Sequence, residues 1–426
     1  MIHLAGSKLM VLGGNPETAS FVKHAESLGI HTVVVDPNPR APAKALSRER
    51  YDLEVFDVDA VVALARRISV EGVIVGVADI LVGPYYEICS KLGLPCYAAE
   101  QSINAFSTKD AFNRTCMAFG VATIPGGVIS LDDRSYLEKL YEFPVVLKPV
   151  DSGAGVGMRV CTRAEDLSAA ADFTLSNSRR GIALVEQLMD CDDMFAYYTA
   201  VAGKAYLSCT ADRLTSRKQP GLSRVCIGAV YPSKHTGQFI AEVNGPVVRM
   251  IEGLGITTGV LNIQFFVRNG TFHAYDPGFR LQGEAPHLPL AEINGIDHRA
   301  MLCSYALSGD VGEPNFVSKN DVYFRGFRVL TVWVILRQGT IGRIVGLDRL
   351  QQMEGVLAIQ TRFKQGDVVT SEMIGTERQV LARIHIKGHS VFDLRNKLAR
   401  LREIFLVQDV DGQDMVVEWV NPDDIQ

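Results

Sequence analysis

The sequence of 426 residues has no surplus of charge of either sign. Its 43 lysine and arginine residues nearly balance 48 aspartate and glutamate residues, which gives a formal net charge of −5. Domains that bind nucleic acid usually carry a basic surplus, so the composition does not indicate a nucleic-acid partner. The apolar content of 47% is ordinary for a folded domain and argues against intrinsic disorder.

Long apolar runs are also missing. The N-terminus has no basic segment followed by a long apolar one, so we expect no signal peptide. The most apolar stretch, residues 70–83, contains Glu71 and Asp79 and is too short to span a bilayer. We therefore expect a cytoplasmic protein with no membrane partner.

Paired cysteines are a third absence. The eight cysteines are scattered from Cys89 to Cys303 and form no C-x-x-C pair. Structural zinc sites use such closely spaced pairs, so we predict no zinc site. We expect buried, reduced thiols.

Strand-like and helix-like patterns alternate through the first hundred residues. Short apolar runs at 8–12, 32–35 and 73–77 are separated by segments with apolar residues at helical spacing. This alternation predicts a parallel sheet covered by helices, with ligands at the carboxyl ends of its strands. Asp36 and Asp79 follow two of these strands, so we expect them at the substrate-binding edge.

From about residue 108 the pattern changes to paired strands. Two hairpins are predicted, one around Gly203 and one around the Asn269-Gly270 dipeptide. After about residue 312 the chain is strand-rich, with one helix that has leucines on one face. There is no internal repeat and no low-complexity linker, so we expect three parts that pack against one another.

A first glycine-rich turn, Gly13-Gly14, lies between a strand and a helix, where a dinucleotide-binding fingerprint belongs. It lacks the G-x-G-x-x-G spacing, and Pro16-Glu17 would crowd a pyrophosphate. Asp36 does resemble the acid that binds a ribose in such sites. A hydride-transfer enzyme is therefore an alternative, ranked behind those below.

A second glycine-rich turn joins two predicted strands. It contains one serine and three alternating glycines: Ser152, Gly153, Gly155 and Gly157. Alternating glycines allow consecutive backbone N–H groups to face one anion, which makes a phosphate cradle, although a plain flexible hairpin is the alternative. Lys148 ends the preceding strand and favours the cradle, because its ammonium group could reach phosphates under the turn.

Taken in order along the chain, these residues resemble the ATP-grasp superfamily. The series that carries the resemblance is Lys109, Lys148, Gly153-x-Gly155-x-Gly157, Glu186, Gln264, Asp276 and Arg280. The N-terminal part, with Asp36-Pro37-Asn38-Pro39, resembles the pre-ATP-grasp domain of carbamoyl phosphate synthase large chains. The functional relatives that the resemblance implies are carboxylate–amine ligases of the L-amino-acid ligase type.

The resemblance implies an α/β fold in three parts. A Rossmann-like pre-ATP-grasp domain would cover residues 1–107. The ATP-grasp domain would cover 108–311, with a flexible lid at about 115–205. A small strand-rich α+β lobe, similar to that of biotin carboxylase-type members, would cover 312–426. Relatives of this kind also imply a homodimer.

The resemblance also implies roles in binding ATP. Lys109 and Lys148 would contact its phosphates, and the turn from Ser152 to Gly157 would close over them. The adenosine end would be bound by Glu186 at the adenine amino group, by the backbone of Gln187 and Leu188 along the adenine edge, and by Asp193 at the ribose.

The implied metal site departs from the family pattern. The family presents Glu on one strand and Glu-x-Asn-x-Arg on the next, whereas this chain has Gln264 and then Asp276-Pro277-Gly278-Phe279-Arg280. Gln264 and Asp276 would still hold Mg²⁺ or Mn²⁺, because one carboxylate plus ATP oxygens can suffice. Gly278 removes the Asn ligand, so the number of metal ions stays open.

The implied reaction is the ATP-dependent joining of a carboxylate, such as an amino acid, to an amine. The γ-phosphate of ATP would turn the carboxylate into an acyl phosphate, and the amine would displace phosphate. Lys148 would neutralise the transferring phosphoryl group, and Arg280 would stabilise the oxyanion. Glu284, His235 and His287 are further substrate-site candidates, with a solvated loop or structural role as the alternative for the histidines.

Two other functions stay open. One is the activation of bicarbonate, as in carbamoyl phosphate synthase or biotin carboxylase. The other is a nucleotide-binding module with a weakened metal site, which the changes at Gln264 and Gly278 would suit.

Overall fold

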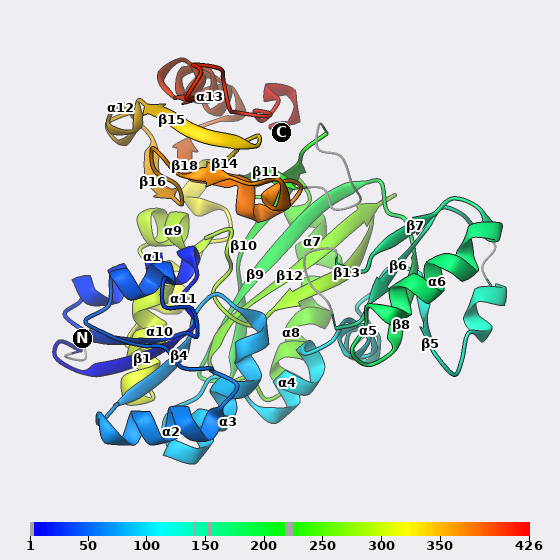
Figure 1. Ribbon diagram of the computed structural model, residues 1–426, viewed down its shortest axis with the longest axis horizontal. Coiled ribbons are helices and arrows are strands. Elements are labelled where there is room, and N and C mark those ends of the chain that lie inside the picture. The colour runs from blue at the N-terminus through cyan, green and yellow to red at the C-terminus, as the bar shows by residue number, and fades with distance from the viewer. Residues whose placement is uncertain (1–3, 140–141, 152–155, 218–224) are drawn as a thin grey trace.

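The computed structural model describes residues 4–139, 142–151, 156–217 and 225–426 (Figure 1). It is a mixed α/β protein, as predicted. None of the helices in these ranges has the length and apolar character needed to cross a membrane.

The N-terminal part is a parallel sheet in the order β3-β2-β1-β4. Its strands are β1 (Lys8–Leu12), β2 (His31–Val35), β3 (Glu49–Tyr51) and β4 (Gly72–Val75). β1, β2 and β4 are almost continuously buried, as expected for strands covered on both faces. The helices of this part are α1 (Pro16–Ser27), α2 (Val58–Arg67) and α3 (Val82–Leu92). The predicted alternation is confirmed.

The start of α1 is tied to the loop after β4. Asn15 caps the helix, since its Oδ1 accepts a hydrogen bond from the backbone N–H of Thr18 at 2.8 Å. The Nδ2 of the same side chain donates to the carbonyl of Val77 at 2.6 Å. One asparagine therefore holds two loops at the carboxyl edge of the sheet in a fixed relation.

The central feature is an antiparallel sheet in the order β13-β12-β9-β10-β11-β14-β18-β16. Its strands are β9 (Asp192–Val201), β10 (Lys204–Thr215), β11 (Cys226–Tyr231), β12 (Gly259–Arg268), β13 (Thr271–Gly278), β14 (Arg328–Ile335), β16 (Val356–Thr361) and β18 (Val380–Gly388). Both predicted hairpins are present, at β9–β10 and β12–β13. Asn269 and Gly270 have φ of 50° and 77°, the backbone that such a turn requires.

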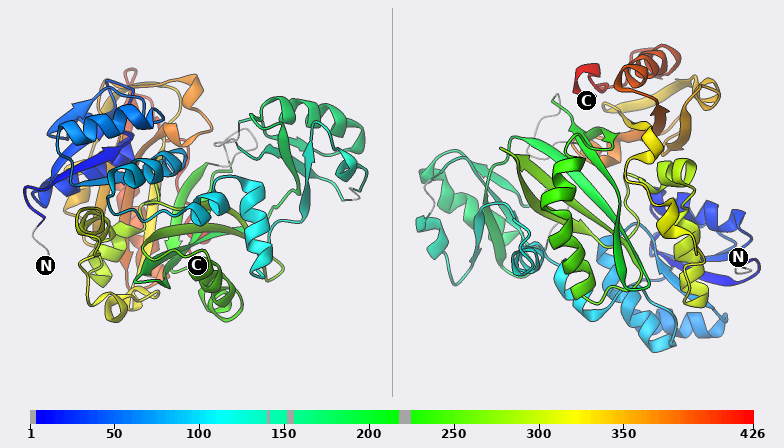
Figure 2. Two further views of the ribbon diagram at one scale, coloured as in Figure 1. Left: turned by 90° about the horizontal axis from the view of Figure 1, so that it is seen from below. Right: turned by 180° about the vertical axis from the view of Figure 1, so that it is seen from behind.

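A smaller sheet projects from the rest of the molecule (Figure 2). It has the order β5-β8-β6-β7, with β5 (Gly126–Ser130), β6 (Val145–Pro149), β7 (Arg159–Cys161) and β8 (Ile182–Gln187). Helix α6 (Leu167–Ser176) covers it and closes a separate apolar core. The predicted lid includes this sheet and also β9, which belongs to the central sheet.

The remaining elements surround the central sheet. A third sheet has the order β17-β15-β19, with β15 (Gly339–Val345), β17 (Val368–Val369) and β19 (Leu406–Asp409). The other helices are α4 (Glu100–Phe106), α5 (Lys109–Ala118), α7 (Thr236–Glu242), α8 (Asn244–Gly253), α9 (His287–Pro289), α10 (His298–Ser308), α11 (Phe316–Lys319), α12 (Leu347–Gln351) and α13 (Val391–Ile404). α10 packs on β4 and α1, so a late segment completes the N-terminal part. The domain boundaries stay a prediction.

Candidate functional site

A cavity of about 200 Å³ lies where the N-terminal part, the β12–β13 hairpin and the C-terminal lobe meet. Its walls come from the start of α1, the end of β13 and the loop that follows it, and from Glu377. Gln264, Asp276, Arg280 and Glu284, all predicted site residues, line it. The structure therefore brings these four together.

The hairpin end of the cavity presents oxygen atoms. Gln264 lies opposite Asp276 in the antiparallel register, and Asn262 lies opposite Gly278. Asn262 is 4% exposed, and its Oδ1 has no hydrogen-bond partner among the described residues. A carboxylate and two amides, one of them with an orphaned acceptor, fit a hard cation such as Mg²⁺, which prefers oxygen ligands.

The charges around Asp276 are mainly positive. Burial raises the pKa of Asp276, and the cationic groups of Lys109, Lys148 and Arg280 act against that rise. Burial in turn lowers the pKa of Lys109, with Asp276 as the chief opposing charge. The predicted phosphate-binding lysines therefore interact electrostatically with the predicted metal ligand.

Arg280 is held by a residue of the N-terminal part. Its Nη2 lies 2.5 Å from Oδ2 of Asp79, and its Nη1 donates to the carbonyl of Leu281 at 2.9 Å. Asp79 follows β4, so the predicted strand-end acid does reach the site, through Arg280.

Lys148 and Glu186 form a buried ion pair. The Nζ of Lys148 lies 2.6 Å from Oε2 of Glu186, and the two side chains are 13% and 4% exposed. Our prediction assigned them to opposite ends of ATP, whereas here they contact each other directly. Lys148 and Glu186 come from neighbouring strands, β6 and β8, whose pairing brings them together.

The glycine-rich turn is described only in part. Ser152, Gly153 and Gly155 lie outside the described residues. Gly157 has φ of 75°, and a Cβ there would lie 2.6 Å from the Cβ of Asn177. A side chain at 157 is therefore excluded both by backbone strain and by space.

The backbone N–H groups of Gln187 and Leu188, predicted to lie along the adenine edge, already donate hydrogen bonds within the protein. The backbone N–H of Gln187 donates to the carbonyl of Pro125 at 2.9 Å, and that of Leu188 donates to the carbonyl of Pro144 at 3.0 Å. An adenine amino group, which donates hydrogen bonds, would have to use carbonyl oxygens here.

Asp193 and Glu284 share one arginine. The Nη1 of Arg213 lies 2.7 Å from Oδ2 of Asp193, and its Nε lies 2.9 Å from Oε1 of Glu284. The hydroxyl of Tyr275 donates to Oδ1 of Asp193 at 3.0 Å. Burial raises the pKa of Asp193 to about 6 despite Arg213. Of the two acids, Glu284 lines the cavity and Asp193 does not.

Three predicted substrate residues are not brought to the cavity. Asp36 accepts a hydrogen bond from the backbone N–H of Asn38 at 2.8 Å, within its own loop. The Nε2 of His235 lies 2.9 Å from Oδ2 of Asp192. His287 is buried in α9, and burial keeps the pKa of its ring far below the usual value.

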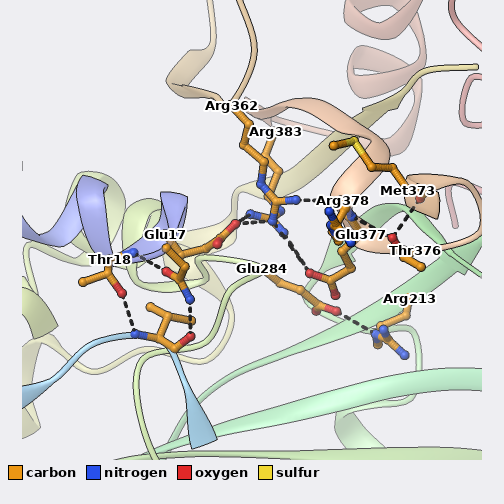
Figure 3. Close-up of polar contacts among 12 residues, drawn as sticks. Glu17, Thr18, Arg213, Glu284, Arg362, Met373, Thr376, Glu377, Arg378 and Arg383 are labelled. Carbon is orange, nitrogen blue, oxygen red and sulfur yellow. Dashed lines mark hydrogen bonds and ion pairs between the residues drawn. The ribbon is translucent and has the colours of Figure 1, made fainter. Parts of the chain in front are cut away.

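A group of four charged residues next to the cavity was missed by the sequence analysis. We call Glu17, Arg362, Glu377 and Arg383 the C-terminal ion network (Figure 3). Glu17 pairs with Arg362 and with Arg383, the latter at 2.8 Å, and Glu377 pairs with Arg383 at 3.3 Å. Glu17 and Glu377 also line a second cavity of about 400 Å³. No local motif could reveal contacts between residues 345 and 366 positions apart.

Asn262 was missed for a different reason. It precedes Gln264 by two residues, and side chains two apart on a strand share a face. The spacing of two residues from Gln264 is therefore a signal in the sequence that indicates Asn262.

Similarity to known proteins supports the predicted resemblance. Residues 108–191 match the family model of the carbamoyl-phosphate synthase L chain, ATP binding domain. The chain is 25% identical over 274 residues to the formate-dependent phosphoribosylglycinamide formyltransferase of Erythrobacter litoralis, an alignment that covers 63% of this chain and 68% of that relative. Alignments with other curated relatives of the same name span about half of their length.

Solved structures share the fold at low sequence identity. The L-amino acid ligase from Bacillus licheniformis has a TM-score of 0.75 and 16% identity, covering 95% of this chain and 99% of that chain. The biotin carboxylase domain of Hydrogenobacter thermophilus 2-oxoglutarate carboxylase, a dimer with MgADP and bicarbonate, has a TM-score of 0.77 and 16% identity, covering 94% and 90%. The likeness confirms the predicted fold class.

Proposed function

We propose that the chain is a member of the ATP-grasp superfamily and acts as an ATP-dependent ligase that joins a carboxylate to an amine. The proposal rests on one observation above all. Asp276 and Arg280 line the same cavity, and the charges of Lys109, Lys148 and Arg280 all act to lower the pKa of Asp276. A positively charged environment of this kind suits the transfer of a negatively charged phosphoryl group from a nucleotide to a carboxylate.

The reaction has two balanced steps. A carboxylate oxygen of the first substrate attacks the γ-phosphorus of ATP, the bond to the bridging oxygen breaks, and ADP leaves. The amine nitrogen of the second substrate then attacks the carbonyl carbon, the phosphate leaves with the electron pair of the C–O bond, and the nitrogen loses a proton. Positioning and charge neutralisation supply most of the rate in such transfers.

The residues of this chain divide the work between nucleotide and substrate. Lys109 and Lys148 neutralise phosphate charge, and binding of nucleotide would draw Lys148 away from Glu186. Gln264 and Asp276 would hold Mg²⁺ or Mn²⁺, which supplies charge stabilisation when bound. Arg280, fixed by Asp79, donates N–H groups to the oxyanion that forms on the acyl carbon.

The surroundings suit an amino acid as one of the substrates. Glu284 lines the cavity together with Arg280, so its wall offers an acceptor for an ammonium group and donors for a carboxylate. The relatives point the same way, because formate is a carboxylate and an L-amino acid carries both groups.

The test is substrate-dependent release of ADP and phosphate. The protein is incubated with MgATP and pools of amino acids and other small carboxylates, and the products are weighed by mass spectrometry. We expect release with a specific pair and a product whose mass is the sum of the two minus water. Release that requires bicarbonate would favour the carboxylating alternative, and nucleotide binding without cleavage in any pool would favour a binding module.

A further inference from the structure

The β12–β13 hairpin holds two unusual residues side by side. Gly278 stands where the ATP-grasp pattern has asparagine, and Asn262 is its direct partner across the hairpin. Asn262 lies two residues before Gln264, so the two side chains leave the same face of β12. Asn262, Gln264 and Asp276 all line the cavity of about 200 Å³.

The side chain of Asn262 is buried and incompletely bonded. It is 4% exposed, and within the described part of the chain nothing donates a hydrogen bond to its Oδ1. Folded proteins satisfy nearly all buried polar atoms, because an unmade bond forfeits the hydration of that atom. An orphaned acceptor in a cavity wall, beside a carboxylate and a second amide, indicates a ligand that carries positive charge.

We propose that Oδ1 of Asn262 is a ligand of the divalent cation that accompanies the nucleotide. The amide oxygen that the family supplies from position 278 on β13 is supplied here from position 262 on β12, one strand away. Asp276 and the amides of Gln264 and Asn262 then form the protein's oxygen donor set. The inference rests on the proposed function only in requiring that a metal–nucleotide complex binds.

Gly278 leaves room for a direct test of this exchange. A Cβ at Gly278 would lie 3.5 Å from the guanidinium of Arg280 and from Oδ1 of Asp79, which is ordinary contact. Its φ is not in the left-handed region, so an asparagine meets no backbone strain there. The ligand can therefore be moved back to β13.

The experiment measures Mn²⁺ binding to the full chain in the presence of saturating ADP, using the electron paramagnetic resonance signal of free Mn²⁺. N262A should bind Mn²⁺ at least about tenfold more weakly than the wild type. Adding G278N to N262A should recover the affinity to within about threefold. ADP affinity in EDTA should be the same for all three proteins.

A matched control separates the ligand role from the loss of a buried amide. Asn294 is 1% exposed and its Oδ1 also has no partner in the described ranges, but it lines neither cavity. N294A should bind Mn²⁺ like the wild type. If N262A fails to fold, N262D replaces it, and the added carboxylate should tighten Mn²⁺ binding.

Three results would overturn the assignment. They are a wild-type Mn²⁺ affinity in N262A, an unchanged Mn²⁺ affinity in N262D, and a wild type that binds no Mn²⁺ in the presence of ADP. None of these measurements needs turnover. A protein that shows the expected Mn²⁺ pattern but joins no substrates would overturn the proposed function and leave the role of Asn262 in place.

Discussion

The cavity has two ends that are built in opposite ways. At the hairpin end, Asn262, Gln264 and Asp276 present oxygen atoms from adjacent strands, and Oδ1 of Asn262 has no partner in the described part of the chain. In the C-terminal ion network, by contrast, the charged groups pair with one another. An open set of donors is suited to receive a ligand, whereas a paired set is suited to hold two parts of a protein together.

The comparison predicts that substitutions at the hairpin end impair function and that substitutions in the network impair stability. Both ends contain buried charge, so burial alone would not separate them. What separates them is whether each charge already has a partner before any ligand arrives.

The largest effect is expected for Asp276→Asn. Turnover should fall by at least about a thousandfold, because the only carboxylate of the proposed donor set is lost. Burial raises the pKa of Asp276, so its charge destabilises the folded state, and the variant should melt at the same temperature or higher. Steady-state phosphate release and thermal unfolding check both parts. If the residual turnover of the variant depended on magnesium concentration as that of the wild type does, the metal would have to bind elsewhere.

In the network, the largest effect is expected for Arg383→Met. Arg383 is 2% exposed, bonds Glu17 and Glu377, and lies 4.2 Å above the ring of Trp333. Its loss leaves Glu17 with less compensation and should lower the free energy of unfolding by about 3 kcal/mol. Denaturant unfolding measures this. Arg400→Met, at an arginine 56% exposed, should change it by less than about 0.5 kcal/mol. If Arg383→Met and Arg400→Met lowered the free energy of unfolding equally, the C-terminal ion network would have no structural role.

The network should also confer a pH dependence, which Glu17→Gln would isolate. Burial alone would raise the pKa of Glu17, but Arg362 and Arg383 lower it below its ordinary value of 4.5. The stabilisation is therefore present above pH 4.5 and lost as pH falls through the lowered pKa. At pH 7 the variant should be about 2 kcal/mol less stable than the wild type. The difference should shrink below pH 4.5, and a difference that stays constant down to pH 3 would contradict the ion pairs.

The hairpin end could be predicted from the sequence because its information is local. The Asn269-Gly270 turn sets the register of β12 and β13, and the register sets which side chains share a face. Gln264 and Asp276 follow from that pairing. Asn262 was within reach of the same argument.

The network could not be predicted, because its partners meet only after the chain has folded. Glu17 begins the first helix, whereas Arg362 follows β16 and Arg383 lies within β18. The pairing of Lys148 with Glu186 was equally hidden, since each residue matched a separate part of the nucleotide pattern. Lys148 has two suitable partners, a phosphate group and the carboxylate of Glu186, and the sequence pattern indicates only the first.

Only a small loss of stability is expected at Asp79, which belongs to the N-terminal part and pairs with Arg280 of the cavity wall. It pairs with Arg280 at 2.5 Å but is 51% exposed, so Asp79→Asn should cost less than about 1 kcal/mol of stability. Because Asp79 positions Arg280, the Asp79→Asn substitution should lower kcat by about tenfold and leave the KM for ATP unchanged. Asp79→Glu should recover part of kcat, and Asp59→Asn, at an acid 85% exposed, should be neutral. A rise in KM alone would make Asp79 a substrate-binding residue, and Arg280 would then have to be positioned without it.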